Sequence, residues 1–248
     1  MAQERWQPEP TDFPPTVITV DSPPVESMQF AALPWAATLG VASAWHTAEE
    51  MSRNAERIAS EFRGHRAGRA ALFALVAELL AVGSVALALL PLIALSFPRA
   101  ATRALFNPSY ALLLGGEAVV GVVLMALLMV GLHALWAWGM ELGVWNRGLP
   151  RNWNSGVALA CYSCGWDLVT SPFGVCVLLF GKGPRSVGPV VRAALNAPRL
   201  CVNAYLQGAR EFSEADQSAV LRFAVWVTAP VVLLLAGGLL VGLVAILA

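Results

Sequence analysis

Four strongly apolar stretches, bounded by polar segments, follow one another along the chain from residue 70 to its end. Three of them are long enough for a helix that crosses about 30 Å of hydrocarbon, which needs about 20 residues. These predicted spans cover about 70–97, 110–138 and 223–247. The remaining stretch, 155–181, is interrupted in its middle by Gly165, Asp167, Ser171, Pro172 and Gly174. It is therefore either one broken spanning helix or a re-entrant hairpin.

The part of the chain before the first span divides into two segments. Residues 1–34 are rich in proline and acidic residues and show no apolar period, which predicts a disordered, extended tail. Residues 35–69 predict an interfacial amphipathic helical region, in which Trp35 and Trp45 are expected to serve as interfacial anchors. Thr47 followed by Glu50 predicts a capping box that begins a helix at 47. The membrane domain then covers 70–248.

A further amphipathic helix is predicted over 186–212, after the interrupted stretch. An apolar stripe and a polar stripe recur there with the same helical period. Such a helix lies in the membrane interface with its arginines toward anionic headgroups, or packs on the cytoplasmic side of the protein itself. The candidate lipid contacts on the polar stripe are Arg192, Arg199 and Arg210.

Composition places the chain among membrane proteins. It is 57% hydrophobic and only 13% charged, against about 25% charged residues in a typical soluble domain. Sixteen basic and sixteen acidic residues cancel, and the mean hydropathy is +0.64. These values exclude an ordinary soluble enzyme, a disordered protein and a nucleic-acid binder that works by bulk positive charge. Fifteen of the sixteen basic residues are arginine, which indicates GC-rich coding, and we expect a bacterial source.

The arginines distinguish the two interpretations of 155–181. If this stretch crosses the membrane, the two sides receive eight basic residues each; if it returns, they receive fourteen and two. The positive-inside rule favours the second distribution. We therefore expect three full spans, one re-entrant helical hairpin over 155–181 and cytoplasmic interfacial helices. The predicted location is the bacterial inner membrane, with the N-terminus cytoplasmic and the C-terminus at the outer face.

Ionisable residues inside predicted spans are costly and mark candidate functional positions. The candidate intramembrane polar site consists of Glu78, Glu117, His133 and Asp167. At 1.5 Å per residue, Glu78 and His133 both lie toward the inner side of their spans and can meet, whereas Glu117 lies toward the outer side. Asp167 is expected at the tip of the hairpin. These groups form either a proton or ion path or a set of hydrogen-bonded carboxyls between helices.

Other chemistry-bearing residues give weaker signals. Cys161 and Cys164 form a CxxC, but the sequence shows no histidine close to them, so we expect buried structural thiols. No Walker loop, catalytic triad, HExxH or GxGxxG occurs, and we expect no enzyme, no cofactor and no metal. Glycines in the second span (Gly115, Gly116, Gly121) and the last span (Gly238, Gly242) permit close helix contacts.

Two motifs resemble the Yip family of Ypt/Rab-interacting membrane proteins, in its bacterial branch. They are the entry Leu33-Pro34-Trp35 and the stretch Ala160-Cys161-Tyr162-Ser163 with Ser171-Pro172. The resemblance covers about 34–248 and implies a cytoplasmic N-terminus, an outer C-terminus and a role in membrane organisation or partner recruitment. The chain departs from the family by its amphipathic insertion 184–212 and by having only three clear spans.

The sequence therefore predicts a non-enzymatic integral membrane protein that scaffolds, recruits partners or organises the membrane. Its expected partners are the lipid bilayer, including anionic lipids, and a protein partner or a second copy of the chain, but no nucleic acid. One alternative is a small channel or transporter component that uses the intramembrane carboxylates. A further alternative is a membrane thiol protein that uses Cys161 and Cys164.

Overall fold

The computed structural model describes residues 33–60, 62, 67–209 and 212–247, with side chains for all of these except 36, 209 and 239–247. The predicted tail 1–34 therefore lies outside the described residues but for its last two positions. The described residues form an all-α membrane protein. Three helices are long and apolar enough to cross a membrane, namely α4 (Ala67–Ser96), α6 (Pro108–Asn146) and α10 (Glu214–Leu247).

Proline and small capping residues divide the helices between these spans. A proline occupies the first turn of α5 (Pro98–Phe106), α6, α8 (Pro172–Lys182) and α9 (Pro184–Ala204), where its missing N–H costs no hydrogen bond. The side chain of Asn107 accepts a hydrogen bond from the Tyr110 amide and begins α6. Because α6 runs on to Asn146, it extends eight residues beyond the predicted span 110–138.

The interrupted stretch 155–181 forms a bent pair of helices. Helix α7 (Trp153–Thr170) passes through Gly165 and Asp167 without a break, so the prediction of Asp167 at a non-helical tip is wrong. The break comes at Ser171, whose hydroxyl accepts from the Gly174 amide, and α8 leaves at 67° to α7. A side chain at Gly174 would lie 2.3 Å from the Leu168 carbonyl oxygen, so this bend requires glycine.

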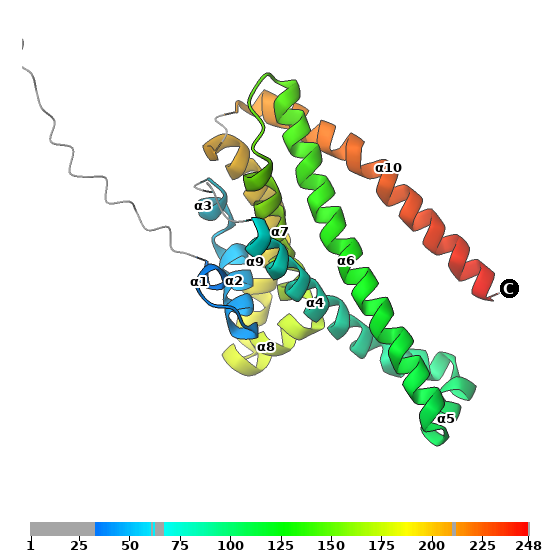
Figure 1. Ribbon diagram of the computed structural model, residues 1–248. Coiled ribbons are helices and arrows are strands. Elements are labelled where there is room, and N and C mark those ends of the chain that lie inside the picture. The colour runs from blue at the N-terminus through cyan, green and yellow to red at the C-terminus, as the bar shows by residue number, and fades with distance from the viewer. Residues whose placement is uncertain (1–32, 61, 63–66, 210–211, 248) are drawn as a thin grey trace, which may run out of the picture. The chain divides into compact units, whose positions relative to one another are not determined.

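The chain leaves the C-terminal end of α6 at residue 147 and comes back to that same end at residue 216. At that end Arg147 forms a 3.1 Å ion pair with Asp216 in the first turn of α10. Nearby, a Cβ placed on Gly143 would lie 3.1 Å from the Cα of Val220, so the two helices are in direct contact. Figure 1 shows α6 and α10 meeting at this end and diverging toward the C-terminus. By length and composition, α7 and α8 together form either a broken span or a re-entrant loop, so both interpretations of 155–181 stay open.

The short N-terminal helices pack into the protein core. They are α1 (Pro34–Ala37), α2 (Val41–Arg53) and α3 (Ala55–Ser60). Trp35 and Trp45 are 3% and 7% exposed, so the expectation that they anchor in the membrane interface is wrong. The predicted capping box is also wrong: α2 begins six residues before Thr47, whose hydroxyl accepts from the Trp35 amide at 2.9 Å and ties α1 to α2.

Helix α9 lies against the protein rather than free in the interface. It packs on α2, α3, α7 and α8 and leads into a π-helical turn, Tyr205–Ala209. Its inward face is small and apolar: Val190, Ala194, Ala197, Cys201 and Ala204 are buried. Of the two interpretations of this amphipathic helix, the structure therefore shows the one in which it packs on the protein. Its exposed face still carries Arg192 and Arg199.

Burial is confined to one region of the molecule. In α4 every buried residue lies between Ala70 and Ala81, and in α6 every one lies between Ala126 and Val144. No residue from 82 to 125 is buried, and none from 229 to 238. We call residues 82–125 and 229–238 the apolar arms. The packed region consists of α1–α3, α7–α9, the π-helical turn Tyr205–Ala209, and residues 67–81, 126–146 and 212–228.

Candidate functional site

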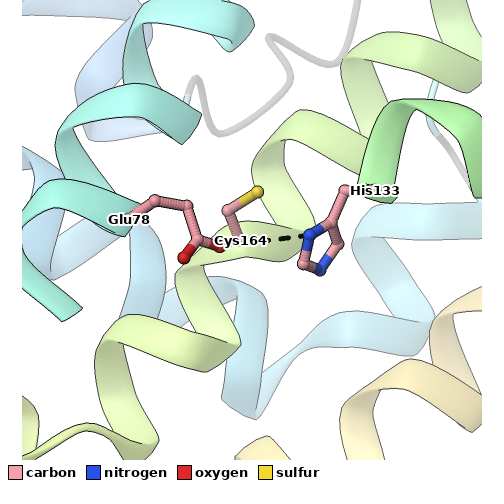
Figure 2. Close-up of side chains that lie close together, drawn as sticks. All are labelled: Glu78, His133 and Cys164. Atoms are coloured by element: carbon pink, nitrogen blue, oxygen red, sulfur yellow. Dashed lines mark ion pairs between the residues drawn. The ribbon is translucent and has the colours of Figure 1, made fainter. Parts of the chain in front are cut away.

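Polar side chains from three helices meet inside the packed region. Glu78 comes from α4, His133 from α6, and Cys164 and Asp167 from α7. Figure 2 shows Glu78, Cys164 and His133 pointing toward one another from their separate helices, and potential ligand atoms of these three lie within 4.8 Å of one another. His133 Nδ1 is 3.9 Å from Glu78 Oε1, and His133 Nε2 is 3.5 Å from Asp167 Oδ2. We call these four residues the polar cluster.

Backbone packing explains why the cluster forms at this depth. Gly165 lets α7 approach α2 and α4 closely, since a Cβ there would lie 2.9 Å from the Cα of Ala48 and 3.3 Å from the Phe73 ring. Trp166 then donates its indole N–H to the Met51 carbonyl at 3.2 Å and holds the rotation of α7. With α7 held in this way, Cys164 and Asp167, which lie three residues apart on one helix face, turn toward α4 and α6.

The hydrogen bonding of His133 determines which of its two ring nitrogens carries the hydrogen and which has a free lone pair. Nδ1 lies 3.0 Å from the Met129 carbonyl, which can only accept, so Nδ1 carries a hydrogen. In the neutral ring Nε2 is then an acceptor, and it faces the acceptor Oδ2 of Asp167. Two acceptors 3.5 Å apart need a proton or a cation between them to be stable.

Two carboxylate oxygens of the cluster are left without hydrogen bonds. Glu78 is 1% exposed, and among the described residues neither its Oε1 nor Oδ2 of Asp167 has a hydrogen-bond partner. Asp167 and the Cys164 thiol are close enough to interact with the Glu78 carboxyl. Buried polar atoms are hydrogen-bonded in the great majority of cases, because desolvation without a partner is costly. The cluster is thus built to hold something positively charged.

The structure unites three of the four predicted site residues and separates the fourth. Glu117 lies on an apolar arm, exposed beside Leu113, Val120 and Leu124. It precedes His133 by sixteen residues on the same helix, which places it about 24 Å away along the axis. A proton or ion path through Glu117, Asp167 and Glu78 would have to cross that gap.

Cys164 is a member of the site that the sequence does not reveal. The expectation that the CxxC is purely structural rests on the lack of a histidine close to it along the chain. Both cysteines are buried, as expected, but the structure brings His133 beside Cys164 by the packing of α6 on α7, so a histidine does lie close to the motif in space. Cys161, its partner in the motif, is also buried but is not among the residues that converge. Only the pairing of α6 with α7, which hydropathy does not encode, could have revealed the contact.

A cavity of about 670 Å³ adjoins the polar cluster between α6, α7, α9 and α10. Its walls are mostly apolar, with Trp136 and Met140 from α6, Leu159 from α7 and Leu221 and Val225 from α10 among them. Polar residues interrupt this lining: His133 of α6, Ser163, Asp167 and Thr170 of α7, and Arg199 and Asn203 of α9. This is the composition of a ligand pocket, in which apolar walls supply area and a few polar groups orient the ligand.

The three predicted lipid-contact arginines differ in position. Arg199 lines the cavity, Arg192 is exposed on α9 away from it, and Arg210 lies outside the described residues. Cys201 also lines the cavity, and burial raises the pKa of its thiol to about 12. This thiol therefore stays protonated at neutral pH and adds to the apolar wall.

A buried carboxylate that the sequence did not single out joins the elements around the cavity. Glu141 of α6 is fully buried and accepts hydrogen bonds from the Tyr205 hydroxyl at 2.9 Å and the Asn152 amide at 2.8 Å. Gly156 makes room for it, because a Cβ at 156 would lie 2.8 Å from Glu141 Cγ. Glu141 thus connects α6, the start of α7 and the π-helical turn.

No protein-family model, curated protein or solved structure matches this chain. The resemblance to the Yip family therefore stays a prediction carried by two short motifs. Both motifs are packed at the core, where Leu33, Trp35 and Tyr162 are buried. The function is accordingly inferred from the geometry of the cavity and the polar cluster.

Proposed function

We propose that the protein is a non-enzymatic, multi-pass protein of the bacterial inner membrane that organises its membrane by binding an anionic phospholipid. The observation that carries this proposal is the cavity between α6, α7, α9 and α10, which combines apolar walls with Arg199 on its lining. One acyl chain occupies the cavity, and the phosphate of the headgroup lies against the guanidinium of Arg199.

The shape and lining of the cavity support an acyl chain as the occupant. Its volume of about 670 Å³ falls in the range of pockets that enclose apolar ligands, about 300–1,000 Å³. Leu221 and Val225 belong to α10, which is long and apolar enough to cross a membrane. The cavity is therefore lined in part by a spanning helix, and a lipid chain can enter it from the bilayer.

The charge distribution supports an anionic headgroup and a cytoplasmic position for this face. The segments before α4 and between α8 and α10 carry most of the basic residues, whereas the connection between α4 and α6 carries only Arg99 and Arg103. With α7–α9 returning to the end where α6 stops, these basic segments lie on one side. We place that side in the cytoplasm by the positive-inside rule. Anionic lipids in the cytoplasmic leaflet bind each nearby basic residue with a free energy of about 1 kcal/mol.

The experiment is native mass spectrometry of the full chain released from nanodiscs that contain equal amounts of anionic and zwitterionic lipid. Wild type is expected to retain one anionic lipid per chain. Arg199→Gln is expected to weaken that binding about fivefold, the equivalent of about 1 kcal/mol.

Arg192→Gln is the matched control, because it removes the same charge from the same helix without touching the cavity lining. It is expected to retain lipid as wild type does. Equal loss in both variants would mean that surface charge alone attracts lipid, and retention in Arg199→Gln would mean that the cavity is not the binding site. Either result would overturn the proposal.

A further inference from the structure

The polar cluster contains a set of side chains suited to a metal ion. We infer that Glu78, His133, Cys164 and Asp167 bind one divalent transition-metal ion, and that the ion is zinc by the chemistry of the ligands. The set offers one thiolate, one imidazole and two carboxylates. Zinc is borderline in softness and accepts sulfur, nitrogen and oxygen ligands in four-coordinate sites.

One pair of groups in the cluster is spaced as two ligands of a tetrahedral site are. Two nitrogen or oxygen ligands about 2.1 Å from a tetrahedral zinc ion lie about 3.4 Å from each other. His133 Nε2 and Asp167 Oδ2 are 3.5 Å apart. Ligand atoms of Glu78, His133 and Cys164 lie within 4.8 Å of one another. Glu78 Oε1 approaches His133 at Nδ1, 3.9 Å away, so side chains must turn for Glu78 to share the ion that Nε2 and Asp167 bind.

The orientation of His133 matches that of a metal ligand. Metal-binding histidines commonly donate their second ring N–H to a carbonyl or carboxylate, which holds the ring and its tautomer. Here Nδ1 donates to the Met129 carbonyl at 3.0 Å and leaves the lone pair of Nε2 facing Asp167. A cation at that point also supplies the missing partner of the two carboxylate oxygens that lack hydrogen bonds among the described residues.

An entry route and a means of charge compensation are both present. His133 and Asp167 line the cavity and are 24% and 38% exposed, whereas Glu78 is 1% exposed at the inner end of the cluster. A divalent ion that enters through the cavity meets His133 and Asp167 first. Its charge offsets the negative charge of the buried Glu78 carboxylate, which is otherwise costly to desolvate, and that of the partly exposed Asp167. Binding releases the thiol proton of Cys164 to solvent.

The site joins three helices that, among the described residues, are otherwise linked at this depth by apolar packing and by the approaches of His133 to Glu78 and Asp167. Because α4, α6 and α7 each contribute a ligand, the bound ion stabilises their relative positions. The inference does not rest on lipid binding: Arg199→Gln, which removes a cavity residue outside the polar cluster, is expected to leave metal binding unchanged. Failure of the lipid experiment and failure of the metal experiment are therefore separate results.

The test loads the purified full chain in nanodiscs with zinc, removes free ion by gel filtration and measures bound zinc by elemental analysis. Wild type is expected to retain one zinc per chain. Replacement by cobalt is expected to give a thiolate-to-cobalt charge-transfer band, a signature that only a bound cysteine sulfur produces. Cys164→Ser, a change of one atom, is expected to abolish the band and weaken metal affinity about 100-fold or more.

Cys161→Ser is the matched control, since it makes the same change at a buried cysteine on the same helix outside the cluster. It is expected to keep both the band and the affinity. Glu78→Gln, which keeps the size of the side chain, is expected to weaken affinity without removing the band. Wild type that binds neither ion, or a Cys164→Ser variant that binds as well as wild type, would overturn the inference in favour of a hydrogen-bonded histidine–carboxyl cluster.

Discussion

The two halves of α6 are both apolar in sequence but have different surroundings. Residues 108–125 belong to an apolar arm and none of them is buried, whereas residues 126–146 include seven buried positions. Lipid tails solvate apolar side chains as well as another helix does, so hydrophobicity gives a span no reason to pack. Close packing in a membrane comes from small residues and from polar groups that need partners. The buried polar side chains, and the glycines in tight contact with another element, lie outside the apolar arms.

Glycine shows the same contrast most clearly. Gly139 and Gly143 press against α10, where Cβ atoms would lie 3.0 Å from Ala224 Cα and 3.1 Å from Val220 Cα. The sequence suggested five glycines for helix contacts. Four of them have no described atom within 4 Å of the position that a Cβ would take, namely Gly115, Gly116, Gly121 and Gly238. The surroundings of Gly242 lie outside the described residues. A glycine therefore marks a contact only where a partner helix is present.

Enlarging a glycine in the packed region is expected to destabilise the protein more than any other change considered. Gly165→Leu forces a side chain against the backbone of Ala48, which cannot move aside, at an expected cost of about 3 kcal/mol. The midpoint of thermal unfolding in detergent, followed by fluorescence-detected gel filtration, is expected to fall by roughly 6–12 °C. Gly116→Leu on the apolar arm is the control and is expected to leave the midpoint unchanged. A similar decrease of the midpoint in both variants would contradict the distinction between the packed region and the apolar arms.

A smaller effect is expected from removing a buried carboxylate of α6. Glu141→Ala takes away the acceptor for the Tyr205 hydroxyl and the Asn152 amide, at an expected cost of about 2 kcal/mol. The same melting assay is expected to show a decrease of roughly 4–8 °C. Glu117→Ala, on the arm of the same helix, is expected to change stability by no more than about 0.5 kcal/mol. A larger loss from Glu117→Ala than from Glu141→Ala would show that burial does not separate the two halves of the helix.

The exposed ion pair between α6 and α10 is expected to contribute least. Arg147 and Asp216 are 43% and 38% exposed, so their interaction is screened and contributes about 0.5 kcal/mol. A double-mutant cycle with Arg147→Gln and Asp216→Asn, measured by melting at low and high salt, is expected to give a small coupling that salt removes. A coupling above about 2 kcal/mol that persists in high salt would show that the ion pair, rather than the glycine contacts, holds these helices together.

Hydropathy predicts the fold to the level of three long apolar helices and one interrupted segment. It misses the extensions of α6 to Asn146 and of α10 back to Glu214, because these parts carry polar residues that lower their hydropathy. Glu141 and Gln217 are buried there by packing, and most of the other polar residues are exposed. The position of each residue along its predicted span places Glu78 and His133 toward the inner side of the membrane and Glu117 toward the outer side. It cannot bring Cys164 to them or bury Trp35 and Trp45, because those contacts depend on which helices pair and how each is rotated.

We propose that the packed region recognises an anionic lipid, and that the apolar arms anchor the protein in the bilayer. This division is tested by cross-linking with two photoactivatable phospholipids that differ only in headgroup charge, followed by peptide mapping. Cross-links specific to the anionic lipid are predicted to concentrate in α9 around 195–203 and in the facing parts of α6 and α7. The zwitterionic lipid is predicted to label the apolar arms as strongly as the anionic one does. An excess of anionic over zwitterionic cross-links on residues 82–125, with none on α9, would show that the arms and not the packed region recognise the lipid.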